Sequence, residues 1–241
     1  MTIMTISTMK ISLWSRLLDL IAPRLCCVCG RRLAMTENSI CSVCNLNLPR
    51  LRMLESSFTD NVMARMFWGL APVERAYALF CYASHSDSSN ILYSLKYHDH
   101  PEIGIDMGRI MASEIHPDGF FEGIDLLVPM PLSKNREGQR GYNQSEMLAL
   151  GISEITGIPY ETKAIERKAF KESQTRLNKW ERKENVAGKF CLADGTLLRG
   201  KHILLIDDVV TTGATMLACA DAIKHLDGIR ISFLALAISK K

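Results

Sequence analysis

The sequence predicts an α/β protein whose mostly parallel sheet is flanked by helices and preceded by a small cysteine-rich module. From about residue 71 onward, strand-like apolar runs alternate with helical patterns, which is typical of βαβ units. Two Cys-x-x-Cys pairs lie within the first 44 residues. The 241 residues, 47% of them hydrophobic, suffice for one good core and a small appendage.

The expected elements of the α/β part follow one another in a regular order. The clearest strand is "HILLI" at 202–206, because it is a short continuous apolar run of the kind buried in parallel sheets. The other strands are expected at 76–83, 124–132 and 230–238. Helices are expected between them, at 87–97, 104–116, 143–156 and 213–226.

The chain divides into four expected segments. They are an amphipathic helix at 1–21, a cysteine-rich module at 22–50, a linker at 51–70 and the α/β domain at 71–241. The N-terminal helix is expected to dock on the rest of the protein, with a membrane surface as the alternative. No apolar run is long enough to span a bilayer and no cleavage pattern follows the helix, so a cytoplasmic, reducing location is expected.

The two cysteine pairs predict a structural zinc ribbon. Cys26 and Cys29 form one pair, Cys41 and Cys44 the other, and eleven residues separate the pairs. Four thiolates at this spacing match a closed tetrahedral Zn²⁺ site, which leaves no open position for catalysis. Cys27 is a poorer ligand than Cys26, because only one residue then separates it from Cys29. A reducing compartment favours metal binding over disulfides.

Residues 203–215, "ILLIDDVVTTGAT", place two adjacent acids at the end of a buried strand. Burying two carboxylates together is costly, so Asp207 and Asp208 require a compensating cation or a set of hydroxyl donors. Successive side chains of a strand point to opposite faces, so the two acids can project from one face only if the strand has already ended and turned. The loop that follows has almost no bulk, and free amides at the start of the next helix form a ready anion site. The stretch therefore predicts a phosphate beside a polyhydroxyl group.

Other phosphate-binding devices are absent from the sequence. The chain contains neither G-x-x-x-x-G-K-[ST] nor G-x-G-x-x-G, which excludes a P-loop and a dinucleotide fingerprint. The formal net charge is +3, so composition alone does not indicate a nucleic-acid binder. Residues 163–189 are locally basic, with nine Lys and Arg against four Glu. This segment is either a solvated surface element or a mobile flap that meets an anionic ligand.

The stretch "LLIDDVVTTGAT" (204–215) resembles the 5-phosphoribosyl 1-pyrophosphate (PRPP) signature of type I phosphoribosyltransferases. The motifs "RGYNQ" (140–144), "SQTRLNKWERKENVAGKF" (173–190) and "SLKYHDHPEIG" (94–104), with the cysteine pairs, are similar to the ComF family, whose relatives include GntX. That family is linked with natural competence and DNA uptake. The resemblance covers almost the whole chain from about residue 12 and implies a type I phosphoribosyltransferase fold with an N-terminal zinc ribbon.

The resemblance assigns roles to individual residues. Asp207 and Asp208 correspond to the acids that contact the ribose hydroxyls. Together with Arg140, they are the candidate catalytic residues. The loop expected to bind the 5′-phosphate is formed by Thr211, Thr212, Gly213, Ala214 and Thr215. The candidate contacts to the pyrophosphate, including those from the flap over it at 163–189, are Lys134, Arg136, Arg176 and Arg182. Mg²⁺ is expected to bridge the pyrophosphate and ribose oxygens.

Two functions are compatible with these features. One is a phosphoribosyltransferase that transfers the pentosyl group of PRPP to an acceptor. The other is a non-catalytic adaptor that binds a phosphorylated ribose or single-stranded DNA, while the zinc ribbon recruits a helicase-like competence protein. The basic segment can contact phosphates in either case and does not separate the two. No purine or pyrimidine pocket is evident from the sequence.

Overall fold

The computed structural model describes residues 23–51, 57–84, 86–97, 100–168 and 189–239. A four-stranded sheet lies at its centre in the order β1-β6-β5-β2, and every neighbouring pair is parallel. The strands are β1 (Val73–Tyr82), β2 (Leu126–Pro129), β5 (His202–Val210) and β6 (Arg230–Ser239). The four expected strands and the mostly parallel sheet are confirmed.

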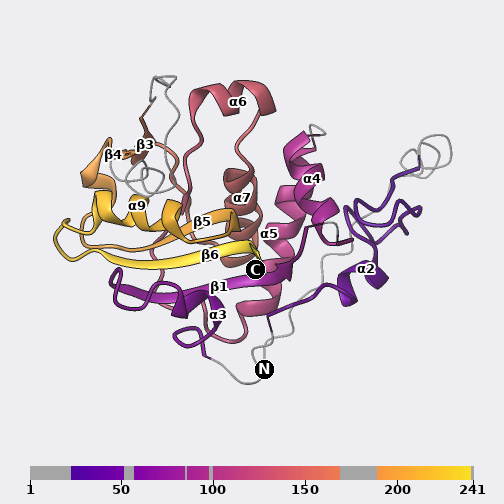
Figure 1. Cartoon of the computed structure of the whole chain (residues 1–241), viewed down its shortest axis with the longest axis horizontal. Coiled ribbons are helices and arrows are strands. Elements are labelled where there is room, and N and C mark those ends of the chain that lie inside the picture. Colours follow the sequence, from indigo (N-terminus) through magenta and orange to yellow (C-terminus); the bar gives the residue numbers. More distant parts are fainter. Residues whose placement is uncertain (1–22, 52–56, 85, 98–99, 169–188, 240–241) are drawn as a thin grey trace.

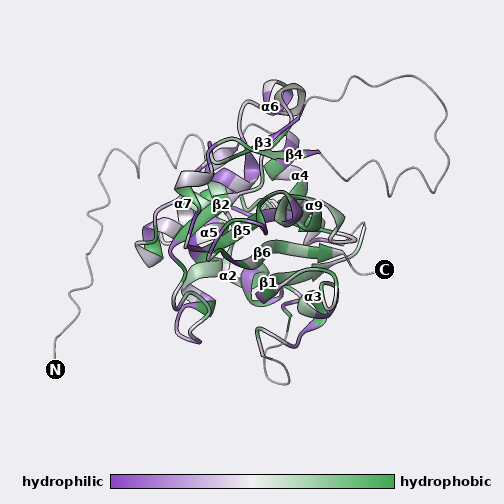
Figure 2. Ribbon diagram, turned by 90° about the vertical axis from the view of Figure 1, so that its left-hand side faces the viewer, coloured by the Kyte–Doolittle hydropathy of each residue, from purple (hydrophilic) through white to green (hydrophobic). Residues whose placement is uncertain are grey.

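Helices cover both faces of the sheet (Figures 1 and 2). Figure 2 shows α5 and α7 on one side of the sheet and α9 and α3 on the other. The helices are α2 (Ser42–Leu46), α3 (Val62–Arg65), α4 (Ser89–Tyr97), α5 (Pro101–Ile115), α6 (Lys134–Arg140), α7 (Gln144–Thr156) and α9 (Ala214–Ile223). Both central strands, β5 and β6, are therefore buried on their two faces, which explains their continuous apolar runs.

Glycines allow α5 and α7 to cross at very short range. A Cβ added at Gly151 would lie 2.0 Å from the carbonyl oxygen of Ile105, and one at Gly108 would lie 2.3 Å from that of Leu148. No side chain fits at either position, so the two helix backbones pack directly against each other. The start of α7 lies beside the carboxyl ends of β2 and β5, where Asn143 donates to the Met130 carbonyl and Ser145 donates to Asp207.

A second, smaller sheet pairs β3 (Ile165–Arg167) with β4 (Phe190–Leu192) in antiparallel fashion. These strands flank the central part of the basic segment, whose residues 169–188 lie outside the described chain, as do Arg176 and Arg182. The helix expected at 1–21 also lies outside it. In the part of the chain that is described, no helix has the length and apolar character required to cross a bilayer.

The segment expected as a linker contributes side chains to the core. Met63 and Phe67 are fully buried, and the Phe67 ring meets Phe233 of β6 edge-on with 4.6 Å between centroids. Aromatic pairs in this geometry add stabilisation beyond the apolar area that they bury. The segment around α3 thus packs against β6 and against the loop that follows β5.

Candidate functional site

The two adjacent acids lie within β5 and not beyond it. β5 continues to Val210, and Asp207 and Val209 pair with Ala235 and Ala237 of β6. β5 therefore extends past the "HILLI" run expected at 202–206, because the parallel pairing with β6 continues past the acids. Their side chains have different partners, as alternation along a strand requires.

Each acid meets one residue from a distant helix. The Asp208 carboxylate forms an ion pair with Lys96 of α4, with 2.8 Å between Oδ2 and Nζ. The Ser145 hydroxyl of α7 donates to Asp207 Oδ1 at 3.4 Å, and the backbone N–H of Asp208 donates to the same oxygen at 2.9 Å. The sequence predicted a compensating cation or hydroxyl donors for these acids, and the structure contains one of each.

The neighbouring carboxylate and the apolar surroundings make Asp207 hard to ionise. Burial is the main cause, and the charge of Asp208 adds to it; together they raise the pKa of Asp207 to about 8. Asp207 therefore holds its proton to a higher pH than an ordinary carboxyl group does. A carboxyl group with a strongly raised pKa beside a second carboxylate is typical of a functional site.

The loop after β5 is held open by a glycine. Gly213 has φ 73° and forms the N-cap of α9, and a Cβ there would lie 2.6 Å from Cε1 of Phe67. Thr211, Thr212 and Thr215 are exposed, and the Thr212 hydroxyl accepts a hydrogen bond from the Ala214 N–H at 3.4 Å. The loop therefore combines exposed hydroxyls with the positive end of a helix, which favours an anion.

The "RGYNQ" motif forms the corner between α6 and α7. Gly141 ends α6 in the left-handed region, and the Asn143 side chain caps α7 by accepting from the Ser145 N–H. The Tyr142 hydroxyl donates to the Leu95 carbonyl of α4 at 2.7 Å. The corner and α4 are thus tied together on either side of the acid pair.

The structure gives fewer contacts for the predicted cations than for the two acids. Arg140 donates to the Gln144 side chain at 2.7 Å, and no contact among the described residues joins it to Asp207 or Asp208. Lys134 and Arg136 belong to the first turn of α6. Sequence reasoning missed Lys96 and Ser145: Lys96 lies within a motif that resembles the family and Ser145 directly follows one, but only tertiary contact reveals their partners.

The four predicted zinc ligands come together. The sulfur atoms of Cys26, Cys29, Cys41 and Cys44 all lie within 4.8 Å of one another. Zn–S bonds of about 2.3 Å in a tetrahedron place sulfurs about 3.8 Å apart, and Cys29 and Cys41 are separated by 3.9 Å. None of the eight cysteines, all of which are described, forms a disulfide. The donor set fits a closed metal site.

Hydrogen bonds favour the thiolate form of Cys26, whereas burial and the neighbouring thiols raise the pKa of Cys44. Burial opposes the ionisation of Cys26, but backbone N–H groups outweigh it and lower the pKa of this thiol to about 7. Glu37 accepts from the N–H groups of Ala34 and Ser42, which lowers its pKa to about 2. The carboxylate thus holds together the loop between the two cysteine pairs.

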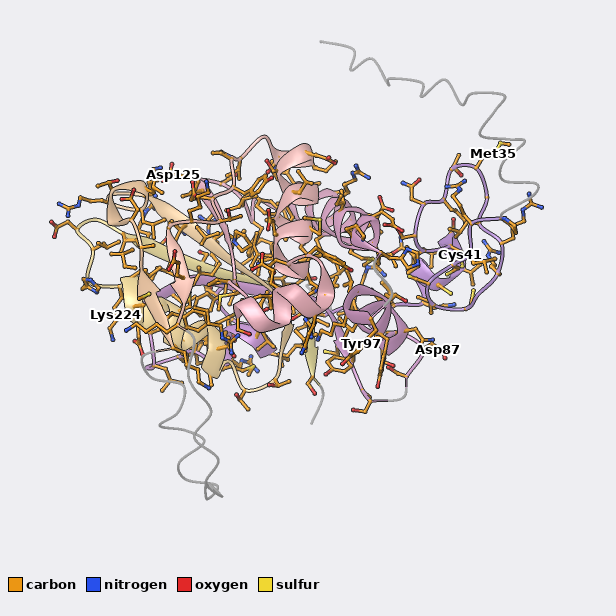
Figure 3. All side chains as sticks on the ribbon, turned by 90° about the horizontal axis from the view of Figure 1, so that it is seen from above. Met35, Cys41, Asp87, Tyr97, Asp125 and Lys224 are labelled. Carbon is orange, nitrogen blue, oxygen red and sulfur yellow. The ribbon has the colours of Figure 1, made fainter. Side chains whose placement is uncertain are left out.

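The cysteine module contacts the α/β domain through polar bridges. The Ser39 hydroxyl donates to Asp106 of α5, and the Asn90 side chain of α4 donates to the Val28 carbonyl at 2.9 Å. Figure 3 shows Cys41 at the opposite end of the molecule from Lys224, which follows α9. The cysteine cluster therefore lies far from the end of α9.

Comparison with known proteins identifies the class of this fold. Residues 152–240 match the phosphoribosyl transferase domain family, and this range contains β5, the acid pair and α9. Together with the parallel sheet flanked by helices, the match defines a protein with the type I phosphoribosyltransferase fold. The structure overlaps with purine phosphoribosyltransferase from Pyrococcus horikoshii at a TM-score of 0.35 and 17% identity, over 56% of this chain and 73% of that one. This overlap is too small to add to the argument.

Curated proteins also match parts or most of the chain. The DNA utilization protein YhgH of Salmonella typhimurium is 28% identical over 206 residues, which cover 82% of this chain and 89% of that protein. Competence protein ComFC of Bacillus subtilis is 36% identical over 43% of this chain and 38% of its own length. Competence protein F of Haemophilus influenzae is 31% identical over 38% and 41%. The chain is thus similar to proteins named for DNA utilization and competence, and part of it matches the phosphoribosyl transferase domain family.

Proposed function

We propose that this protein binds PRPP, or another 5-phosphorylated ribose, together with Mg²⁺ at the carboxyl end of β5. The observation that carries the proposal is the acid pair of Asp207 and Asp208, which lies directly before an open, hydroxyl-lined loop at the start of α9. Ligands of open α/β sheets bind at the carboxyl ends of the strands. The relatives named for competence and DNA utilization support a role connected with DNA uptake.

The chemistry of each group suits one part of the ligand. Carboxylate oxygens accept hydrogen bonds from the 2′- and 3′-hydroxyls of ribose, while exposed amides and hydroxyls donate to the 5′-phosphate. In this assignment Asp207 and Asp208 hold the sugar. The 5′-phosphate is held by Thr211, Thr212, Gly213, Ala214 and Thr215. Ribose also relieves the cost of two neighbouring buried acids.

A magnesium ion fits this donor set. Mg²⁺ is usually bound by one or two carboxylates and by substrate phosphates, so a site without a full protein cage is suitable. When bound, the ion would supply positive charge against the pyrophosphate. Arg140 lies at the corner before α7 and is our leading cation for the departing pyrophosphate, with Lys134, Arg136, Arg176 and Arg182 as the further candidates.

In an enzyme of this design, the chain contributes mainly position and charge. Holding the ribose by two hydroxyls and one phosphate fixes C1 relative to the acceptor, and fixed cations stabilise the charge that develops on the leaving group. The second candidate function is an adaptor that binds without turnover. The names of the DNA utilization and competence relatives favour it, because those names describe the handling of DNA.

Calorimetric titration with PRPP and Mg²⁺ tests the proposal, with Asp207→Asn and Asp208→Asn as variants. We expect binding by the parent chain and at least a tenfold loss of affinity in each variant, since an amide has one acceptor oxygen and cannot supply the negative charge that attracts Mg²⁺. Thr196→Ala, an exposed change outside the loop, is the control. Pyrophosphate release in the presence of an acceptor indicates an enzyme, and binding without release indicates the adaptor. If the parent chain does not bind PRPP but binds DNA with an affinity that depends on salt, the proposed site is wrong.

A further inference from the structure

One short helix, α4, contacts both the cysteine module and the acid pair. Near its start, the Asn90 side chain donates to the Val28 carbonyl at 2.9 Å. Near its end, the Lys96 ammonium group contacts the Asp208 carboxylate at 2.8 Å. Asn90 and Lys96 are six residues apart, which is about 9 Å along a helix. Figure 1 shows α4 between α7 and the indigo segment that contains α2. Less than two helical turns therefore join the two candidate sites.

The contact with Val28 lies inside the first cysteine pair. Val28 stands between Cys26 and Cys29, whose sulfur atoms belong to the four-cysteine cluster. Two ligands that hold one metal ion fix the backbone between them, so the direction of the Val28 carbonyl depends on the metal. Small modules of this kind lose their fold without their ion. Removal of the metal should therefore deprive Asn90 of its acceptor.

The helix between the two contacts is too short to be stable on its own. It has nine residues, and isolated helices below about 12–15 residues are marginal in water. Ile91, Leu92 and Leu95 are buried against the domain, and the first turn carries no acidic residue that would favour the helix dipole. Because helix formation is cooperative, loss of the first turn at Asn90 leaves too few residues to hold the last turn, which carries Lys96.

The last turn of α4 brings a positive charge to the proposed ribose site. Lys96 and Asp208 are only 24% and 16% exposed, so solvent and salt screen their attraction weakly. The charge of Lys96 offsets the negative charge that would repel a phosphorylated sugar from the acid pair. The Tyr142 hydroxyl donates to the Leu95 carbonyl and joins the same turn to the start of α7. The position of this turn therefore affects how well an anionic sugar binds.

A second contact of the cysteine module follows a different route. The Ser39 hydroxyl donates to Asp106 of α5. The glycine contacts between α5 and α7 hold these two helices backbone against backbone, so α5 should stay in place without the module. Among the described residues, no hydrogen bond or ion pair joins α5 to Asp207 or Asp208. Ser39 therefore provides a control for docking of the module that does not involve α4.

We infer that Asn90 is a positioning residue through which metal bound by the cysteine module strengthens sugar-phosphate binding at the acid pair. This inference rests on the proposed function and adds a means of regulating the same site. With metal, the cysteine pair is folded and Asn90 is anchored. Without metal, the anchor is missing and α4 no longer holds Lys96 against Asp208. Because coupling between two binding sites is reciprocal, a sugar phosphate strengthens metal binding by the same factor.

Titration of ribose 5-phosphate into the zinc-loaded and the zinc-free full chain tests the inference. Ribose 5-phosphate should bind about 2- to 10-fold more tightly to the zinc-loaded chain, which is the effect of about one hydrogen bond. Saturating ribose 5-phosphate should raise the affinity for zinc by the same factor, measured by competition with a coloured chelator. Equal affinities with and without zinc overturn the inference and leave the ribose site standing. If ribose 5-phosphate binds in neither state, the proposed function fails and this inference fails with it.

Variants of Asn90 test its role while the module stays folded. Asn90→Ala removes the donor but favours the helix, because alanine has the higher helix propensity. The zinc-loaded Asn90→Ala chain should retain its zinc and bind ribose 5-phosphate as weakly as the zinc-free parent. Asn90→Gln can still donate and should restore part of the affinity. Thermal unfolding checks that each variant folds. Ser39→Ala should keep the full effect of zinc, and an equal loss in Ser39→Ala and Asn90→Ala would overturn the role of Asn90.

A variant of Lys96 tests the other end of the helix. In a Lys96→Met background the charge that α4 positions is gone, so neither zinc nor Asn90→Ala should change the affinity for ribose 5-phosphate further. Non-additive effects of this kind are the expected signature of coupled residues. A zinc effect of undiminished size in Lys96→Met would show that the coupling bypasses α4 and would overturn the inference.

Discussion

The cysteine cluster and the aspartate site are assembled in different ways. All four sulfur ligands come from residues 26–44, and local hydrogen bonds such as that from the Cys41 N–H to the Cys26 sulfur hold them in place. The aspartate site joins β5 to Lys96 of α4 and Ser145 of α7, and its loop rests on Phe67. A locally assembled site depends on its ligands and their spacing. A site assembled from distant segments depends on the whole fold.

The largest expected effect concerns the local site. Cys41→Ser replaces a buried ligand and should abolish metal binding, because three remaining thiolates no longer close the tetrahedron. Structural zinc contributes on the order of 10 kcal/mol to small modules, so residues 23–51 should lose their fold. Metal analysis and limited proteolysis measure both effects. Cys191→Ser, outside the cluster, is the control. A Cys41→Ser protein with full zinc content would contradict the assignment.

The next effect shows how far the aspartate site relies on distant packing. Gly213 and Gly157 share φ 73°, but only at Gly213 would a Cβ meet another group, the Phe67 ring at 2.6 Å. Gly157→Ala should therefore cost about 1 kcal/mol of unfolding free energy, for the left-handed backbone alone. Gly213→Ala should cost about 2–4 kcal/mol, because overpacking adds to it. Urea unfolding measures both. Equal losses would show that Phe67 does not support the loop.

The raised pKa of Asp207 predicts a pH-dependent stability. The folded protein binds this proton more tightly than the unfolded chain does, so the stabilisation is complete below about pH 4 and is lost as the pH rises towards 8. The Asn side chain of the Asp207→Asn variant cannot ionise. The free energy of unfolding of this variant should therefore exceed that of the parent by on the order of 1–3 kcal/mol at pH 8, with little difference at pH 4. Urea titrations at several pH values follow the difference. A constant difference between parent and variant would contradict the assignment.

The smallest effect compares two ion pairs with the same 2.8 Å separation. Lys96–Asp208 is mostly buried, whereas Lys224–Asp221 is about half exposed on both sides. Lys96→Met should cost about 1–3 kcal/mol because it leaves Asp208 without its cation, and less in an Asp208→Asn background. Lys224→Met should cost less than about 0.5 kcal/mol. Similar losses for both would mean that Lys96 does not compensate the acid pair.

The same contrast explains what could be predicted from the sequence. The cysteine ligands and the central strands follow from local spacing and apolar runs, such as "HILLI" in β5. The continuation of β5 through Asp207 and Asp208 could not be predicted, because adjacent acids resemble the end of a strand while the pairing with β6 is invisible. Lys96 carries no local signal, since one lysine on a helix is usually solvated.

The contribution of the 51–70 segment was also hidden. The burial of Phe67 depends on its contact with Phe233 and with the loop at Gly213, two partners far along the chain. The connection through α4 has the same origin: Asn90 and Lys96 belong to one helix, while their partners, Val28 and Asp208, lie far apart in the sequence. Only the fold brings these two partners to the two ends of that helix.

A crystal structure with ribose 5-phosphate and Mg²⁺ tests the central claim most directly. The account predicts the 2′- and 3′-hydroxyls on the Asp207 and Asp208 carboxylates, with the 5′-phosphate accepting from amides and hydroxyls of residues 211–215. A sugar phosphate bound elsewhere, with Asp208 still paired only to Lys96, would contradict it.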